Sequence, residues 1–187
     1  MKAILVDLDG TLTDTHAANL AAYKAAIDET GVVYDRPLLE RYVGRLAWKP
    51  MLANVLPDLD ESRHFAIAQR KREIYAGLLD MVAVNDVLVS FLRMHQGKVP
   101  IALVTSASRG SVEPLLRAKA LDDVFSLVIT SDDVERQKPD PEPYARAALS
   151  LGVAAADCVV LEDSDVGAAA AKAFGAQVWR VEWINAG

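Results

Sequence analysis

Five short apolar runs alternate along the chain with segments whose apolar residues recur at helical spacing. The runs predict strands and cover residues 3–6, 101–105, 126–130, 158–161 and 177–181. They are apolar at consecutive positions and not at every second one, which indicates strands that are buried on both faces. Strands of this kind, separated by helices, form a parallel sheet with helices on both sides. We therefore predict an α/β fold, a Rossmann-like three-layer sandwich with a parallel five-stranded core sheet.

Residues 15–84 have a different pattern, because every periodic segment in them is helical. Leu20, Tyr23 and Ile27 lie on one face of the first predicted helix, which Gly31 ends, and further helices follow to about residue 79. This stretch contains no convincing strand. We expect a core domain formed by residues 1–14 and 85–187, with residues 15–84 inserted into it as an all-helical cap domain.

Polar residues follow the predicted strands at positions where no periodicity requires them. They are Asp7 and Asp9 after the first strand, Thr105 and Ser106 at the second, Lys138 on the loop after the third, and Glu162 and Asp163 after the fourth. The carboxyl ends of parallel strands form the ligand site of such sheets, so we expect these side chains to converge. Two simpler interpretations stay open: the aspartates belong to an acidic surface turn, and the two hydroxyls only cap the next helix.

The residue types in this set suit a particular chemistry. Oxygen ligands without histidine or thiolate are typical of Mg²⁺ sites. A lysine, two hydroxyls and the backbone amides at the start of a helix suit a phosphate group. Together these groups predict phosphoryl transfer, in which Mg²⁺ and Lys138 neutralise the charge between an anionic nucleophile and an anionic phosphate.

Composition narrows the possible partners. The 187 residues are 52% apolar, which is enough for a packed core, and 26 acidic against 20 basic residues give a net charge of -6. This balance argues against a nucleic-acid partner. The one basic cluster, Arg70-Lys71-Arg72, precedes Glu73 and is typical of a solvated helix face. The single cysteine, Cys158, is expected in the core.

The same sequence suggests a cytoplasmic protein. The apolar run before the first aspartate has only four residues, too few for a signal peptide, and no apolar run approaches the length of a membrane span. We therefore expect no membrane partner. The oligomeric state does not follow from the sequence, and a monomer is our default expectation.

Four motifs carry a family resemblance over the whole chain. They are Asp7-Leu8-Asp9-Gly10-Thr11, Val104-Thr105-Ser106, Lys138-Pro139-Asp140-Pro141 and Leu161-Glu162-Asp163-Ser164 followed by Gly167. With these motifs in this order, the chain resembles the haloacid dehalogenase superfamily, in its phosphatase and β-phosphoglucomutase-like branch. Residues 15–84 resemble the C1-type helical cap of that superfamily.

The resemblance implies a role for each matching residue. Asp7 would be the nucleophile that forms an aspartyl-phosphate, and Asp9 would protonate the leaving-group oxygen and then activate water. The resemblance also implies that the Asp7 carboxylate, the Asp9 backbone carbonyl and the Asp163 carboxylate ligate Mg²⁺, with Glu162 helping directly or through a water. The phosphate oxygens would be held by Thr105, the amide of Ser106, and Lys138.

Residues 42–49 resemble the loop of the cap that determines substrate specificity in this superfamily. Arg45 and Lys49 could contact a second anionic or hydroxyl-rich part of the substrate, and Trp48 could stack on a sugar face. Trp48 fits the core of the cap equally well. Lys49 fits an ordinary surface position at the start of a helix.

The leading functional hypothesis is a Mg²⁺-dependent phosphatase that acts on a small phosphomonoester, and we expect a sugar phosphate as its substrate. The dehalogenase branch is disfavoured because it lacks the second aspartate, here Asp9. The enzymatic alternative is a sugar-phosphate mutase of the β-phosphoglucomutase type, although Asn19 stands where those mutases have a histidine and no match for their arginine is found near Ala47. A non-catalytic binding or regulatory protein is the alternative from another class, and a cluster of carboxylates that repel one another without a cation argues against it.

Overall fold

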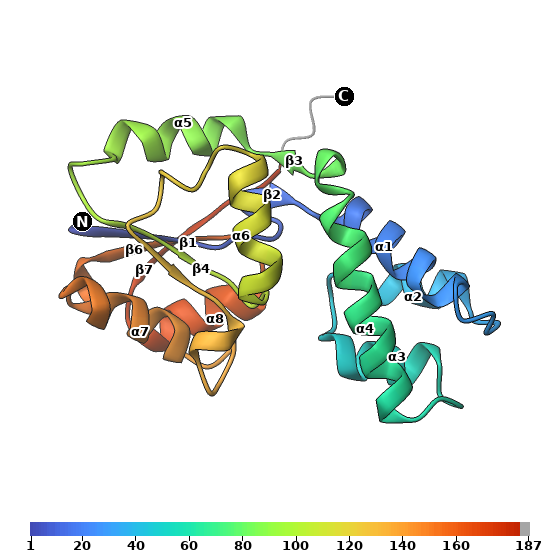
Figure 1. The fold of residues 1–187 in the computed structure, drawn as a ribbon. Coiled ribbons are helices and arrows are strands. Elements are labelled where there is room, and N and C mark those ends of the chain that lie inside the picture. The colour runs from blue at the N-terminus through green and yellow to red at the C-terminus, as the bar shows by residue number, and fades with distance from the viewer. Residues whose placement is uncertain (184–187) are drawn as a thin grey trace. The chain divides into compact units, whose positions relative to one another are not determined.

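The computed structural model describes residues 1–183 and contains the predicted parallel sheet. Five strands lie in the order β5-β4-β1-β6-β7, and the pairs of neighbouring strands are parallel (Figure 1). The strands are β1 (Ala3–Val6), β4 (Ile101–Val104), β5 (Leu127–Ile129), β6 (Cys158–Glu162) and β7 (Gln177–Arg180). All residues of β1, β4 and β6 are buried, as the continuous apolar runs predicted. The edge strands β5 and β7 are only partly buried, so for them the prediction of full burial is wrong.

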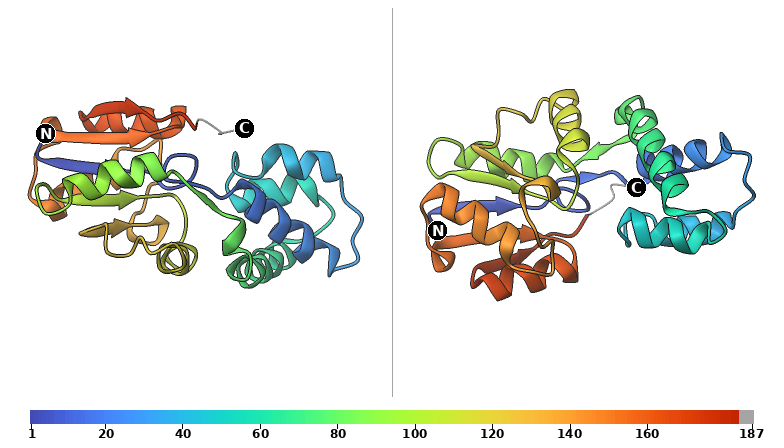
Figure 2. Two further views of the ribbon diagram at one scale, coloured as in Figure 1. Left: turned by 90° about the horizontal axis from the view of Figure 1, so that it is seen from above. Right: turned by 60° about the horizontal axis from the view of Figure 1, so that its bottom comes forward.

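Helices cover both faces of this sheet, which completes the three layers. The helices are α5 (Asp86–His95), α6 (Arg109–Ala118), α7 (Glu142–Leu151) and α8 (Asp165–Phe174). Figures 1 and 2 show α7 and α8 on one face and α5 and α6 on the other. The core under α7 and α8 includes Leu5, Val160, Ala171 and Cys158, and Cys158 is 1% exposed, as expected.

The connections place β1 at a reversal point of the sheet. From β1 the chain proceeds to β4 and β5 on one side, and it then returns to β6 and β7 on the other side. Ligand sites of open parallel sheets lie at the carboxyl ends of the strands at such a point. Val6 is paired with Leu103 on β4 and with Leu161 on β6, so the residues that follow these three positions emerge side by side.

Local signals in the sequence set the helix ends. Asn85 begins α5 with its side chain, whose Oδ1 accepts a hydrogen bond from the Leu88 amide at 3.0 Å. Gly152 ends α7 in the left-handed conformation, with φ of 67°, which glycine adopts without steric cost. The N-cap of α6 is Ser108. The interpretation in which Thr105 and Ser106 only cap this helix is therefore wrong.

Residues Thr15–Ala83 form a second compact unit, and Met1–Asp14 with Val84–Gly187 form the first. The second unit contains α1 (His16–Asp28), α2 (Arg36–Tyr42), α3 (Trp48–Val55), α4 (Glu61–Ala76) and the 3-10 turn η1 (Leu79–Met81), packed around a hydrophobic core of its own. This division differs by one residue from the expected boundary.

Several short elements were not predicted. The strands β2 (Thr13–Asp14) and β3 (Ala83–Val84) pair as a two-stranded sheet where the chain passes between the units. Two-residue strands are too short to show any periodicity. The 3-10 turns η2 (Ser131–Asp133) and η3 (Ala155–Asp157) lie in connections of the first unit. None of the described helices is long and apolar enough to cross a membrane.

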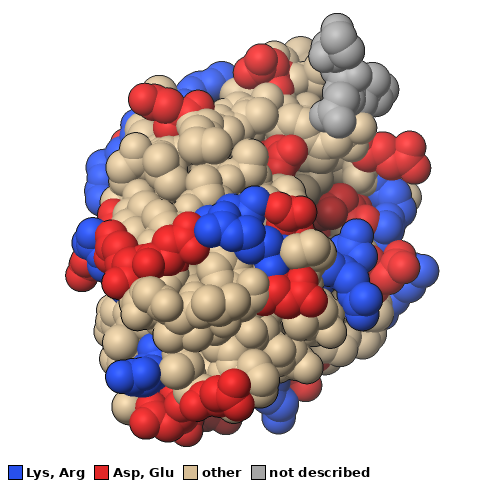
Figure 3. All heavy atoms as spheres, turned by 90° about the vertical axis from the view of Figure 1, so that its right-hand side faces the viewer, with Lys and Arg blue, Asp and Glu red and all other residues tan. Residues whose placement is uncertain are grey.

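Basic and acidic side chains are interspersed on the surface. On the face shown in Figure 3, Lys and Arg groups lie beside Asp and Glu groups. Arg70 illustrates the pattern, because its guanidinium pairs with Glu29 at 2.6 Å and with Glu73 at 2.8 Å.

Lys71 does not belong to the solvated face that the basic cluster suggested. It is 8% exposed, and its ammonium donates to Asn19 and lies 5.1 and 4.5 Å from the ring centres of Tyr23 and Tyr75. Consecutive residues of a helix point in directions about 100° apart, so Lys71 faces α1 while Arg70 faces solvent. For Lys71 the prediction of a solvated position is therefore wrong.

Candidate active site

Asp7 is the first residue after β1, and its carboxylate is almost fully enclosed. It is 7% exposed, and its amide donates to the Leu161 carbonyl at 3.0 Å, which continues the pairing with β6. Burial raises the pKa of Asp7 to about 7. The Glu162 and Asp9 carboxylates also raise this pKa, whereas the charge of Lys138 lowers it. The carboxylate therefore lies in an environment that disfavours its charge unless cations are close.

Lys138 supplies one such cation. Its Nζ donates to Asp7 Oδ1 at 2.6 Å and to the Val104 carbonyl at 3.0 Å, and it lies 3.5 Å from Glu162 Oε1. Burial alone would lower the pKa of Lys138, but the attraction of the Asp7 and Glu162 carboxylates outweighs it and the pKa is raised. The side chain stays an ammonium and bridges β1, β4 and β6.

Three carboxylates lie together beside this ammonium. Oxygen atoms of Asp7, Glu162 and Asp163 lie within 4.8 Å of one another. Glu162 is 1% exposed, its Oε1 accepts from Ser164 Oγ at 2.9 Å, and its Oε2 has no hydrogen-bond partner. Burial also raises the pKa of Glu162. An enclosed oxygen without a partner among clustered carboxylates is what a hard divalent cation satisfies, so these residues fit Mg²⁺.

Thr11 and two glycines hold this cluster, and their contacts did not follow from the sequence. Thr11 Oγ1 donates to Asp163 Oδ1 at 2.8 Å and accepts from the Asp163 amide at 3.0 Å. A Cβ at Gly10 would lie 2.3 Å from Asp163 Oδ2, and one at Gly167 would lie 1.5 Å from Glu162 Oε1. In the sequence, the only indication of these contacts is that Gly10, Thr11 and Gly167 belong to the first and fourth motifs.

The side chain of Asp9 does not join the carboxylate cluster. In an extended chain Asp7 and Asp9 would point the same way, but β1 ends at Val6 and residues 8–10 form a turn. Asp9 is exposed in this turn and bridges to Thr13. The carboxyl of Asp9 is therefore accessible to solvent, whereas that of Asp7 is buried.

Thr105 and Ser106 follow β4 but differ in exposure. Thr105 is 4% exposed, and its Oγ1 accepts from the Ala107 amide at 3.0 Å. Ser106 is exposed. The hydroxyl of Thr105 therefore orders the loop before α6, while Ser106 lies on its accessible side.

The match to known proteins assigns this arrangement to a family. The sequence matches the haloacid dehalogenase-like hydrolase family over residues 1–175. The chain belongs to this family. It is 34% identical to the validoxylamine A 7'-phosphate phosphatase of Streptomyces hygroscopicus subsp. limoneus, over 93% of this chain and 82% of that one.

Two further relatives span most of the chain. It is 30% identical to the fructose-1-phosphate phosphatase of Escherichia coli (strain K12), with 92% of each chain covered. It is 29% identical to the β-phosphoglucomutase of Bacillus subtilis (strain 168), over 94% of this chain and 80% of that one. The family and its phosphatase members confirm the predicted class, a phosphoric monoester hydrolase.

The helical unit of this hydrolase contains the three residues suggested for substrate choice. Arg45 is exposed in the turn between α2 and α3. Trp48 is half-buried, packs against the core of the unit, and its ring centre lies 6.2 Å from that of Phe65. Lys49 is exposed and pairs with Glu61 at 2.8 Å. These contacts favour the packing interpretation for Trp48 and the surface interpretation for Lys49, and they leave Arg45 as the accessible cation of the loop.

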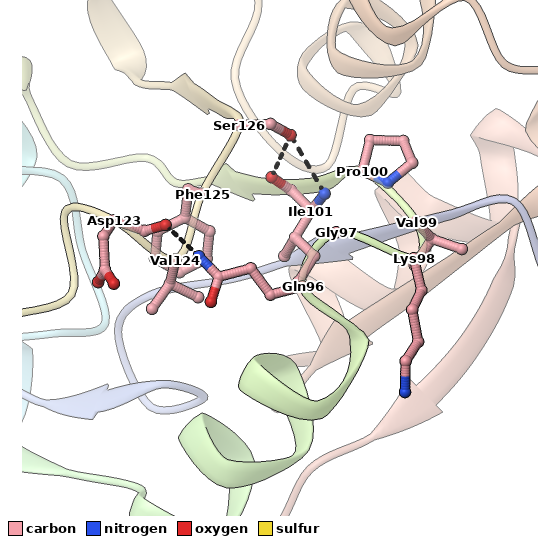
Figure 4. Close-up of a pocket in the computed structure, with 10 residues that line it drawn as sticks. All are labelled: Gln96, Gly97, Lys98, Val99, Pro100, Ile101, Asp123, Val124, Phe125 and Ser126. Carbon is pink, nitrogen blue, oxygen red and sulfur yellow. Dashed lines mark hydrogen bonds between the residues drawn. The ribbon is translucent and has the colours of Figure 1, made fainter.

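A cavity of the hydrolase core lies at the other end of the strands. It measures about 300 Å³ and is lined by residues 96–101 and 123–126, which precede β4 and β5 (Figure 4). Gln96 donates to the Asp123 carbonyl, and Ser126 Oγ bonds with the backbone of Ile101. Gln96 and Ser126 are thus hydrogen-bonded within this lining, which contains no member of the carboxylate cluster.

Proposed function

We propose that this hydrolase is a Mg²⁺-dependent phosphatase that releases phosphate from a small phosphomonoester through an aspartyl-phosphate at Asp7. The observation that carries the proposal is the Lys138 ammonium, 2.6 Å from Asp7 Oδ1 and adjacent to a cluster of three carboxylates. This arrangement offers a nucleophile, a fixed cation and a site for a second cation around one buried point.

The residues divide the reaction between them. An oxygen of Asp7 bonds to phosphorus while the bond from phosphorus to the substrate oxygen breaks, and Asp9 gives its proton to that leaving oxygen. A water then loses a proton to Asp9 and attacks phosphorus, which releases inorganic phosphate and restores the Asp7 carboxylate. Lys138 stabilises the phosphoryl oxygens in both steps, together with Thr105 and the amide of Ser106. When bound by Asp7, the Asp9 carbonyl, Asp163 and Glu162, Mg²⁺ supplies further charge neutralisation.

The substrate we propose is a sugar phosphate. A relative with 92% mutual coverage is a fructose-1-phosphate phosphatase, which supports this class. In the helical unit, we propose that the exposed Arg45 contacts an anionic or hydroxyl-rich group of the substrate, whereas Trp48 packs on the core of the unit and Lys49 pairs with Glu61. A panel of sugar, nucleotide and short-chain acid phosphates, assayed for phosphate release with Mg²⁺, identifies the substrate.

The decisive variant is Asp7→Asn. It removes the nucleophile but keeps the shape of the side chain, so phosphate release from an aryl phosphate should fall by about 1,000-fold or more. Asp122→Asn, at an exposed position of the same unit, is the matched control and should retain wild-type activity. A wild-type protein that is inert with Mg²⁺ across the whole panel would refute the phosphatase and support a non-catalytic binding or regulatory protein.

A mutase of the β-phosphoglucomutase type is the second candidate, supported by the relative of that name. Against it, Asn19 occupies the position expected for a histidine, and its amide is engaged by Thr15 at 3.0 Å and by Lys71. An amide has no proton to exchange near neutral pH. Activation by a sugar bisphosphate and interconversion of hexose-phosphate isomers would favour the mutase over the phosphatase.

A further inference from the structure

Tyr144, on the first turns of α7, lies against the ammonium of Lys138. Its side chain is 0% exposed, and Lys138 Nζ lies 4.9 Å from the centre of its ring. We propose that Tyr144 is a positioning residue whose ring holds Lys138 against Asp7. This inference rests on the proposed function. Nothing in the four motifs assigns a role to Tyr144.

The contacts around the ammonium show what the ring adds. Oxygen atoms lie on three sides: Asp7 Oδ1 at 2.6 Å, the Val104 carbonyl at 3.0 Å and Glu162 Oε1 at 3.5 Å. The ring of Tyr144 occupies a further side with its negative face. A lysine side chain has several rotatable bonds and about 2 kcal/mol of rotamer entropy, so a fixed surface along the ammonium restricts it to one position.

The ring also connects the ammonium to a rigid part of the fold. Lys138 itself lies on a loop, between η2 and α7. Tyr144 belongs instead to the core cluster that contains Leu5 of β1 and Val104 of β4, the strands that precede Asp7 and Thr105. The ring therefore ties the position of a loop residue to the sheet that positions the nucleophile.

The hydroxyl of Tyr144 does not explain its presence. Among the described residues, Tyr144 Oη is a buried oxygen without a hydrogen-bond partner. Burial raises the pKa of Tyr144 well above its ordinary value, so the hydroxyl keeps its proton. An unpartnered buried hydroxyl is unfavourable. The geometry therefore points to the aromatic face, 4.9 Å from Nζ, as the part of Tyr144 that restrains Lys138.

Three variants test this assignment with an aryl phosphate and Mg²⁺. Tyr144→Leu removes the ring and should lower kcat by about 10-fold or more with KM changed less than about threefold. Tyr144→Phe keeps the ring and should restore kcat to within about threefold of wild type. Phe174→Leu, the same type of change at a partly buried position of α8 packed against the same core, is the matched control and should alter kcat less than about twofold.

A crystal structure of Tyr144→Leu provides a readout that does not depend on activity. We expect Lys138 Nζ to have moved by about 1 Å or more from Asp7 Oδ1. Tyr144→Met, which fills more of the vacated volume, replaces Tyr144→Leu in both measurements if the leucine variant does not fold.

Two results would overturn the proposal: a kcat of Tyr144→Leu no lower than that of Phe174→Leu, or a kcat of Tyr144→Phe as low as that of Tyr144→Leu. If wild type is inert on every phosphomonoester, the proposed phosphatase fails, and the crystal structure alone then decides the inference. In that case an unchanged contact between Lys138 and Asp7 in Tyr144→Leu would disprove it.

Discussion

Gly167 has no side chain, and the Glu162 carboxylate occupies the space that a Cβ at this position would take. The first turn of α8 passes so close to Glu162 that a Cβ would lie 1.5 Å from Oε1 and 2.1 Å from the carboxyl carbon. Both partners are constrained, because Ser164 bonds to Glu162 Oε1 and accepts from the Gly167 amide at 3.0 Å. The space for the carboxylate therefore depends on glycine.

Gly167→Ala should displace Glu162 from the carboxylate cluster. We expect Mg²⁺ affinity to fall by about 10- to 100-fold, the usual cost of disturbing groups that orient a metal site. Calorimetric titration of the metal-free protein with Mg²⁺ measures the change. Gly110→Ala, on α6 with no atom near the new Cβ, is the matched control and should bind Mg²⁺ as wild type does. Wild-type affinity in Gly167→Ala would show that Glu162 has little influence on the metal.

The raised pKa of Asp7 predicts how the metal-free protein responds to pH. Its value of about 7 lies above the ordinary value of about 3.9, so the folded state binds the proton more tightly than the unfolded state. The resulting stabilisation is fully present below the unfolded value and is lost as pH rises through about 7. In EDTA, the urea-derived free energy of unfolding of wild type should therefore decrease between about pH 5 and pH 8.

Asp7→Asn isolates this contribution, because an amide does not titrate. Between about pH 5 and pH 8, wild type should lose at least about 1 kcal/mol more of its free energy of unfolding than Asp7→Asn does. Parallel pH profiles for the two proteins would contradict the assignment of a raised pKa to Asp7. Added Mg²⁺ should reduce the difference, because a bound cation favours the carboxylate.

At the scale of elements, α5 begins at a residue with two functions. Asn85 Oδ1 accepts from the Leu88 amide at 3.0 Å, and its Nδ2 donates to the Thr11 carbonyl at 3.3 Å, next to the carboxylate cluster. Asn85→Ala removes both bonds and should lower the free energy of unfolding by about 1 kcal/mol. Asn85→Asp keeps the acceptor and should restore most of it. Equal urea midpoints for wild type and Asn85→Ala would show that the cap contributes nothing.

The sequence predicted the strands and most helices because these elements repeat a local pattern. Continuous apolar runs identified β1, β4 and β6, and the polar residues that follow them identified Asp7, Thr105 and Glu162 as neighbours in a parallel sheet. That inference needed only the direction of the strands, not their register. The structure adds the register, in which Val6 is paired with Leu161, and it places a carboxylate oxygen of the buried Glu162 within 4.8 Å of one of Asp7.

Contacts between distant segments could not be predicted in this way. Thr11 and Asp163 are 152 residues apart, and their two hydrogen bonds depend on how the turn after β1 meets β6. The burial of Lys71 depends on which face of α4 meets α1, which a weakly amphipathic helix does not reveal. The exposure of Asp9 depends on β1 ending at Val6. Beyond that point the side chains no longer alternate between the two faces of the sheet, so the direction of the Asp9 side chain does not follow from that of Asp7.

For the whole molecule, the two units each have a hydrophobic core. The core of the helical unit includes Ile27, Leu39 and Leu52, while the sheet and the helices α5 to α8 belong entirely to the other unit. The groups that contact one another around Asp7, including Lys138, Thr11 and Asp163, all belong to the sheet-containing unit. The side chains of the candidate active site named here thus all lie outside residues 15–83.

Replacing residues 15–83 by a short Gly-Ser linker tests this separation. The remaining chain should fold, because it keeps every strand of the five-stranded sheet and the helices that cover it, and Mg²⁺ should still raise its melting temperature. It should hydrolyse an aryl phosphate but lose discrimination among sugar phosphates by about 10-fold or more, since Arg45 and its neighbours are gone. The same deletion in Asp7→Asn is the control for background hydrolysis. Unchanged discrimination in the shortened protein would place substrate choice in the sheet-containing unit, whereas a folded protein without any response to Mg²⁺ would show that the metal site needs the helical unit.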